Sequence, residues 1–198
     1  MNNIIKLVCL TSLVGLTACG GGDGVVNGGD FTTAPVTFSS LATTGTSLVN
    51  QFDQLDITPI RNMPTSGTSR FDGVGAYSAS ETTFEGVVEN PDTLSKVSFD
   101  ANFARSTIQG RAYDFRSADG GTVTGSLNIS NGVIDDNTFT ADIGGRLNNR
   151  GVPVTYTGDV VGGFGGSKAN ALAGVGVATG KASGYDDQTV TSVFVAKQ

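Results

Sequence analysis

The chain has 198 residues and contains 29 Gly, about 15% of the sequence, but no His and no Trp. The lack of His excludes Ser-His-Asp and Cys-His catalysis, an imidazole general base, and zinc or haem held by histidine. With 12 Lys and Arg against 18 Asp and Glu, the net charge is −6, so the average field repels phosphate backbones. We therefore expect one domain that does not bind nucleic acid.

Residues 1–18 have the pattern of a secretory signal peptide. Lys6 is the only charged residue, and the apolar stretch Leu7–Leu16 follows it. That stretch is too short to span a bilayer as a helix. We expect these 18 residues to be removed, which changes the net charge of the chain from −6 to −7 because Lys6 is lost.

The next feature is Leu16-Thr17-Ala18-Cys19, which resembles the bacterial lipobox. In a lipobox the peptidase cuts before the Cys, which then carries the lipid; the alternative is an ordinary signal peptide cut elsewhere. If lipidated, Cys19 anchors the chain to a membrane through several acyl chains, while Cys9 is lost with the signal. Because Gly20 follows where Asp would favour inner-membrane retention, the resemblance to sorted lipoproteins implies a protein that is lipid-anchored to the outer membrane.

Residues 19–30 are rich in glycine and indicate a flexible tether. A phosphate-binding loop is excluded because no strand precedes the segment, no helix follows it, and no Lys-Ser/Thr pair closes it. Residues 31–70 form an N-terminal extension with short strands expected near 36–42 and 50–58. These strands would form a small handle-like sheet on the main domain or its first strands.

Residues 71–198 show period-two alternation of apolar residues, which is typical of β-strands. A long antiparallel meander avoids exposed edges by closing, so we expect an all-β, eight-stranded up-and-down β-barrel. A short helix is expected at Ser167–Ala173, and Asn131-Gly132 is expected to be a turn. The expected strands are about 71–78, 82–89, 95–104, 107–115, 123–130, 139–147, 152–164, 174–181 and 189–196.

The segment Gly158–Gly176 resembles the final-barrel signature of the transferrin-binding protein B family, and Asn137–Ala141 resembles a strand motif of that family. The residues that match the signature are Gly162, Phe164, Gly166, Ala169, Leu172 and Gly174. The departures are Gly165 for an aromatic residue, Ser167 for proline, Asn170-Ala171 for an acidic pair and Val175-Gly176-Val177 for a phenylalanine strand. The resemblance implies a lipid-anchored barrel at the cell surface. Characterised members bind host iron proteins, haem carriers or complement factor H.

We therefore expect a non-catalytic binding module whose loops and one barrel end contact an iron- or haem-carrying or other extracellular protein, or an outer-membrane receptor. The alternative is a structural, envelope-associated barrel lipoprotein without a small ligand. A porin is disfavoured because aromatic girdles are not apparent and the chain ends in Ala196-Lys197-Gln198.

Few side chains could carry other chemistry, and we expect no enzyme activity, cofactor or metal. Asp53 and Asp56 lack the spacing of a calcium loop, and Asp135-Asp136-Asn137 indicates a turn. Apart from Lys, the side chains that could ligate haem iron are Met63, Tyr77, Tyr113, Tyr156 and Tyr185. We expect each of them to be a core or surface residue instead. Cys19 is the one functional residue that the sequence identifies.

Overall fold

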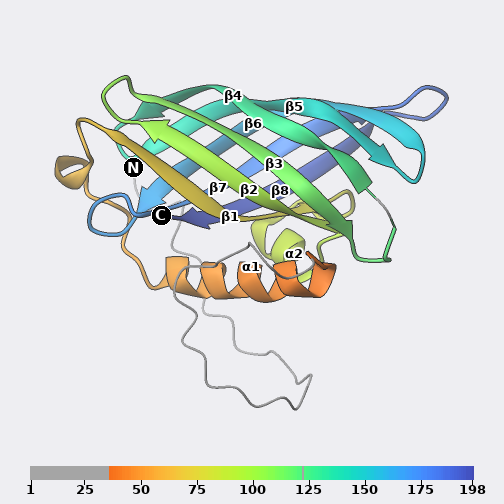
Figure 1. Ribbon diagram of the computed structural model, residues 1–198, viewed down its shortest axis with the longest axis horizontal. Coiled ribbons are helices and arrows are strands. Elements are labelled where there is room, and N and C mark those ends of the chain that lie inside the picture. The colour runs from red at the N-terminus through yellow and green to blue at the C-terminus, as the bar shows by residue number, and fades with distance from the viewer. Residues whose placement is uncertain (1–35, 122) are drawn as a thin grey trace, which may run out of the picture.

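The computed structural model describes residues 36–121 and 123–198, and these form a closed antiparallel barrel of eight strands (Figure 1). Each strand pairs with the next in sequence, and the first pairs with the last. The expected all-β up-and-down barrel is confirmed. The strands are β1 Thr68–Ser78, β2 Thr93–Asn102, β3 Thr107–Ser117, β4 Val123–Asp135, β5 Thr138–Asn149, β6 Val152–Gly165, β7 Ala171–Lys181 and β8 Gln188–Lys197. The expected signal peptide (1–18), Cys19 and the tether (19–30) lie outside the described residues.

The apolar residues of the alternating pattern point into the barrel and fill it. An eight-stranded barrel has an interior just wide enough for side chains, so one continuous core results. The predicted inward-facing residues that are buried in this core are Val97, Phe99, Ala101, Phe103, Val123, Leu127, Ile129, Phe139, Ala141, Ile143 and Leu147.

Two helices, α1 Phe38–Asp53 and α2 Phe84–Glu89, lie outside the barrel against β1, β2 and β8 (Figure 1). A 3₁₀ turn, Ile60–Asn62, leads from α1 into β1. The helices cover a second apolar cluster on the outer face of the barrel, whose buried members are Leu41, Leu48, Val74, Val87, Leu94, Val193 and Val195. In the described part of the chain, neither helix has the length and apolar character needed to cross a membrane.

The short strands expected near 36–42 and 50–58 are wrong, because α1 occupies Phe38–Asp53. Thr37 and Ser40 form a reciprocal capping box: the Thr37 hydroxyl accepts from the Ser40 amide at 3.0 Å, and the Ser40 hydroxyl accepts from the Thr37 amide at 2.9 Å. Burial of Leu41 and Leu48 against the barrel then stabilises a Ser/Thr-rich segment of low helix propensity.

The strand expected at 82–89 is also wrong, because α2 forms there. Thr83 caps the helix by accepting a hydrogen bond from the Gly86 amide at 3.1 Å. Val87 is fully buried in the outer cluster. Packing on the barrel thus overrides the strand preference of these residues.

The helix expected at Ser167–Ala173 is absent from the structure. A turn at Gly166–Ala169 is followed directly by β7, in which Ala171 and Leu172 pair with Lys197 and Ala196 of β8. Pairing with β8 supplies hydrogen-bond partners for the backbone groups of residues 171 and 172, which a helix would otherwise have to supply.

The turn expected at Asn131-Gly132 is a bulge inside β4. Asn131 has a φ of 53°, and the register to β5 shifts between Ser130 and Val133. The chain instead turns between β4 and β5 at Asp136, whose φ is 53°. The turn predicted at Asp135-Asp136-Asn137 is therefore confirmed.

Tyr77 is the one phenol buried within the barrel core, and its hydroxyl lies 3.0 Å from the Ser95 hydroxyl. Burial raises the pKa of Tyr77 above its ordinary value, and the hydrogen bond to Ser95 opposes this rise. The phenol of the unfolded chain ionises near pH 10. The contribution to stability is therefore present below about pH 10 and is lost as the pH rises above it.

We expect the melting temperature to fall between pH 9 and pH 11, and to fall less steeply in Tyr77→Phe. Thermal unfolding followed by circular dichroism across this range measures both slopes. Tyr113 and Tyr156, whose pKa values burial also raises, are common to both proteins. Equal slopes would show that Tyr77 does not control the alkaline transition.

Candidate functional site

The barrel interior is packed with aromatic rings, which leaves the outer surface for binding. Phe164 contacts Phe71, Phe103 and Phe139, with ring centroids between 5.7 and 5.9 Å apart. Phe194 continues the stack to Tyr77 and Phe99 at 5.8 and 6.1 Å. A ligand must therefore bind at a barrel end or on the wall.

One end of the barrel, here called the capped end, is covered by the segment 54–66 that follows α1. Hairpin connections β2–β3, β4–β5 and β6–β7 lie at this end, as do the start of β1 and the end of β8. The connections β1–β2, β3–β4, β5–β6 and β7–β8 lie at the other end, here called the loop end (Figure 1).

The capping segment is fixed to the barrel by hydrogen bonds on both sides of Ile57. The Gly166 amide donates to the Asp56 carbonyl at 2.8 Å, and the Thr58 amide donates to the Phe164 carbonyl at 2.9 Å. The Thr58 hydroxyl, which is fully buried, donates to the Gly166 carbonyl at 2.7 Å. Asn137 Nδ2 donates to the Thr58 carbonyl at 2.8 Å, so the segment is held in one conformation.

This fixed segment exposes large aliphatic side chains to solvent. Ile60 is 58% exposed, Ile57 48% and Leu55 38%. The three residues lie within six positions, and the hydrogen-bonded backbone around Ile57 lowers the entropy that binding must cost. Asp53, Asp56 and Arg61, which are close to them in sequence, are also exposed.

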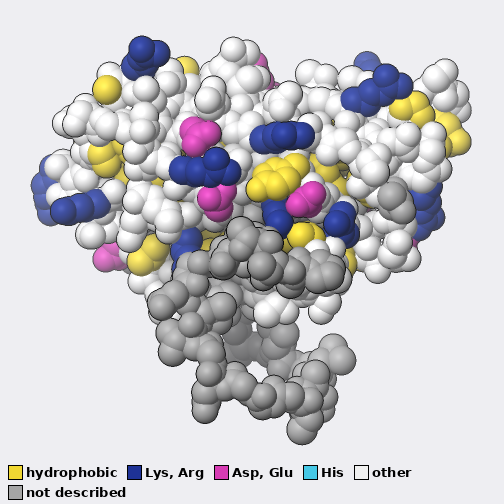
Figure 2. All heavy atoms as spheres, viewed as in Figure 1, with side chains coloured by type: hydrophobic (Ala, Val, Ile, Leu, Met, Phe, Trp, Pro, Cys, Tyr) yellow, Lys and Arg dark blue, Asp and Glu magenta, His cyan; other side chains and the backbone are white. Residues whose placement is uncertain are grey.

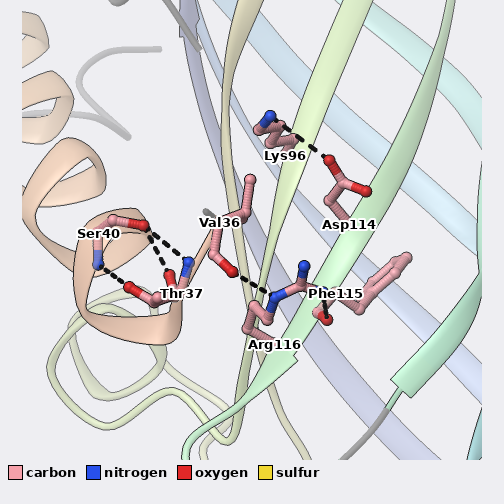
Figure 3. Close-up of polar contacts among 7 residues, drawn as sticks. All are labelled: Val36, Thr37, Ser40, Lys96, Asp114, Phe115 and Arg116. Carbon is pink, nitrogen blue, oxygen red and sulfur yellow. Dashed lines mark hydrogen bonds and ion pairs between the residues drawn. The ribbon is translucent and has the colours of Figure 1, made fainter. Parts of the chain in front are cut away.

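The first described residue, Val36, lies at the loop end of the barrel, opposite the capped end. Arg116, close to the loop end of β3, donates from Nε to the Val36 carbonyl at 2.6 Å, immediately before the capping box of α1 (Figure 3). Lys96 and Asp114 form an ion pair of 3.4 Å on the neighbouring strands (Figure 3). From there α1 runs along the wall, and near its end Gln51 accepts from Lys197 at 2.9 Å. The capped end is therefore remote from the point of entry.

On the face that carries β1, β2 and β3, the charges are of both signs (Figure 2). Figure 2 shows Lys and Arg side chains interspersed with Asp and Glu on the face that carries β1, β2 and β3. Arg70 and Asp72 make one pair, at 3.2 Å, and their hydrogen bond raises the pKa of Arg70. Such exposed pairs contribute little to stability.

The structure scatters the side chains that could have ligated haem iron. Tyr77 is in the core, Tyr156 is half-buried on β6, and Tyr185 is 67% exposed in the β7–β8 connection. Tyr113 lies on β3 with the Arg111 guanidinium 5.9 Å from its ring centroid, and Met63 packs against the core. In the described part of the chain, no ring contact joins two of these tyrosines.

The acidic candidates have structural positions. Asp53 ends α1, and Asp56 contributes its backbone carbonyl to the hydrogen bond from Gly166. Residues 36–121 and 123–198 contain no group of three or more His, Cys, Asp or Glu side chains that could hold a metal ion. The predicted lipidation site, Cys19, lies outside the described residues.

Sequence reasoning missed Leu55, Ile57 and Ile60 as surface residues. The hydrophobicity of Leu55 and Ile57 predicts buried positions, and this prediction is wrong, because the structure places both side chains on the outside. Pro59, Pro64 and Gly67 were the local signals that regular structure stops here.

Comparison with known proteins finds similar solved structures and a family model. No curated protein sequence matches the chain. A double mutant of transferrin-binding protein B from Haemophilus parasuis Hp5 shares 20% identity, with a TM-score of 0.46, over 72% of this chain and 28% of that one. The intact Ap transferrin-binding protein B, with N and C lobes, shares 18% identity at the same TM-score and the same coverage. This chain therefore matches less than a third of the length of either protein.

The model of the family described as C-lobe and N-lobe β-barrels of Tf-binding protein B matches residues 63–198. This region begins at Met63, directly after the 3₁₀ turn, and includes all eight strands. It makes up more than two thirds of the chain. The chain thus belongs to the family of Tf-binding protein B β-barrels.

Proposed function

We propose that this chain is a lipid-anchored outer-membrane protein that binds an extracellular iron- or haem-carrying protein through its capped end. The observation that carries the proposal is the fixed capping segment, which exposes Leu55, Ile57 and Ile60 at one barrel end. Membership of a family of Tf-binding protein barrels makes transferrin the first ligand to test.

The anchor in this proposal is Cys19, which lies 17 residues before Val36, the first described residue. Because Val36 is held at the loop end by Arg116, the segment that would link the barrel to the anchor joins it at the loop end. The capped end is the end remote from that junction. Cys19→Ala should remove the lipid and shift the protein out of the detergent phase in a partitioning experiment.

Ile60→Asp should weaken binding to transferrin by about tenfold or more, because it places a charge where an apolar contact is expected. The full chain carrying Cys19→Ser would be immobilised, and iron-loaded transferrin, iron-free transferrin and haemoglobin would be passed over it. Biolayer interferometry would give the dissociation constant of each.

Tyr185→Asp is the matched control, because Tyr185 is as exposed as Ile60 but lies at the loop end. It should leave the dissociation constant unchanged. Failure of all three proteins to bind would contradict the iron-carrier ligand. Loss of binding in Tyr185→Asp, with binding by Ile60→Asp unaffected, would place the site at the loop end and contradict the proposal.

A further inference from the structure

A second surface, here called the bare wall, lies on the outer faces of β4–β7, away from the main cover of α1 and α2. The residues of the bare wall used below are Ser130, Asp142, Thr157, Asp159, Val161, Val175 and Val177. Two shallow, open hollows lie on it, across β5, β6 and β7, and they share Thr157, Gly158 and Asp159.

An apolar row continues from beneath the helices onto this wall. Val193 of β8, buried in the outer cluster, is the cross-strand partner of Val175, which in turn pairs with Val161 of β6. Val161 is 50% exposed, and Val177, two residues along β7 from Val175, is 55% exposed. The helices thus cover only part of one apolar surface, and the valines of β6 and β7 remain available to a partner.

Two carboxylates lie beside these valines. Asp142 and Asp159 are direct cross-strand partners on β5 and β6, and Asp159 also pairs with Val177. Like charges directly opposite each other destabilise a sheet. Asp142 accepts one hydrogen bond, from Asn131 Nδ2 at 2.7 Å.

No cation of the described residues forms an ion pair with these carboxylates. Elsewhere on the barrel, Asp72, Asp119 and Asp187 each pair with a cation, Arg70, Arg150 and Lys181 respectively. Asp142 and Asp159 form no ion pair in residues 36–121 and 123–198. A cation placed in the hollow between them would interact with both carboxylates and relieve their repulsion.

We propose that the bare wall docks an extended protein segment that presents Lys or Arg and aliphatic residues on one face, at every second position. Charge complementarity selects this occupant: the cation lies between Asp142 and Asp159, and the aliphatic side chains lie on Val161, Val175 and Val177. The closed barrel has no free strand edge, so side chains rather than backbone pairing provide the contact. This surface is separate from the capped end and does not depend on the ligand bound there.

The probe is an amidated seven-residue peptide, Lys-Ser-Val-Ser-Lys-Ser-Val, which carries Lys and Val on the same face when extended. It is titrated into the isotope-labelled full chain carrying Cys19→Ser. Amide shifts should concentrate on β5–β7, around Asp142, Asp159 and Val177. Asp159→Asn should raise the dissociation constant of the peptide by about threefold, which is the effect expected from losing an exposed ion pair. Val161→Thr, which keeps the side-chain shape, should also raise it.

Asp100→Asn is the matched control, because it removes the same charge from an exposed position on β2. It should change the constant by less than Asp159→Asn, and a peptide with Glu in place of Lys should not bind. Equal effects of Asp100→Asn and Asp159→Asn would overturn the proposal, because they would indicate general attraction to an acidic protein. A dimer of the chain in sedimentation that Val161→Thr dissociates would also overturn it, because a second copy would then occupy the wall.

Discussion

Phe164→Ala is expected to lower the free energy of unfolding by about 3–5 kcal/mol, the range measured for buried phenylalanines. Phe164 is fully buried and contacts three other phenylalanine rings, so truncation leaves a cavity that the closed barrel cannot collapse to fill. A loss of this size corresponds to a melting temperature lower by roughly 10 °C for a domain of this length. Urea unfolding followed by far-ultraviolet circular dichroism measures the change.

Phe84→Ala is the control for that experiment, since Phe84 is 38% exposed at the start of α2. It should cost clearly less, because part of the ring already contacts water. Equal losses in the two variants would contradict a filled barrel core as the main source of stability.

Gly158→Ala is expected to destabilise the barrel by about 1–3 kcal/mol or more, through overpacking. A Cβ at this position would collide with the carbonyl oxygen of Val177 and the Cα of Ala178, which belong to the paired strand β7. Backbone atoms cannot rotate away as a side chain can, so β6 and β7 would have to separate. The urea midpoint and the hydrogen exchange of β6 and β7 amides should both report the change.

Gly144→Ala provides the comparison on the neighbouring strand. A Cβ there would meet only the Tyr156 carbonyl oxygen, at 3.2 Å, which a small adjustment accommodates. We expect a much smaller effect than at Gly158. Similar losses at both positions would mean that glycine acts through chain entropy rather than through close strand contact.

The strands were predictable because a barrel wall of this kind has one apolar face, and side chains alternate between its two sides. The stripe of Phe139, Ala141 and Ile143 gave the period directly, and all three residues are buried. The local signals of the helices were weaker. Thr43 and Thr44 bond to carbonyls four residues earlier, and such residues disfavour helices unless packing compensates.

Local sequence patterns also gave wrong predictions where contacts between distant residues decide the local structure. At the bulge at Asn131-Gly132, Gly132 approaches the Ile108 carbonyl on β3 so closely that a Cβ would not fit. The capped end depends on a hydrogen bond from Thr58 to Gly166, 108 residues away. No local pattern encodes such a contact, so the exposure of Ile57 and Ile60 could be found only from the fold.

The most direct test of a surface-anchored protein with an accessible capped end is thiol labelling on intact cells. Ile60→Cys places a thiol at the capped end, and Cys9 and Cys19 are the only native cysteines. We expect a membrane-impermeant maleimide to label Ile60→Cys on intact cells as fully as after lysis. Labelling only after lysis would contradict surface display, and with it a function in binding extracellular proteins.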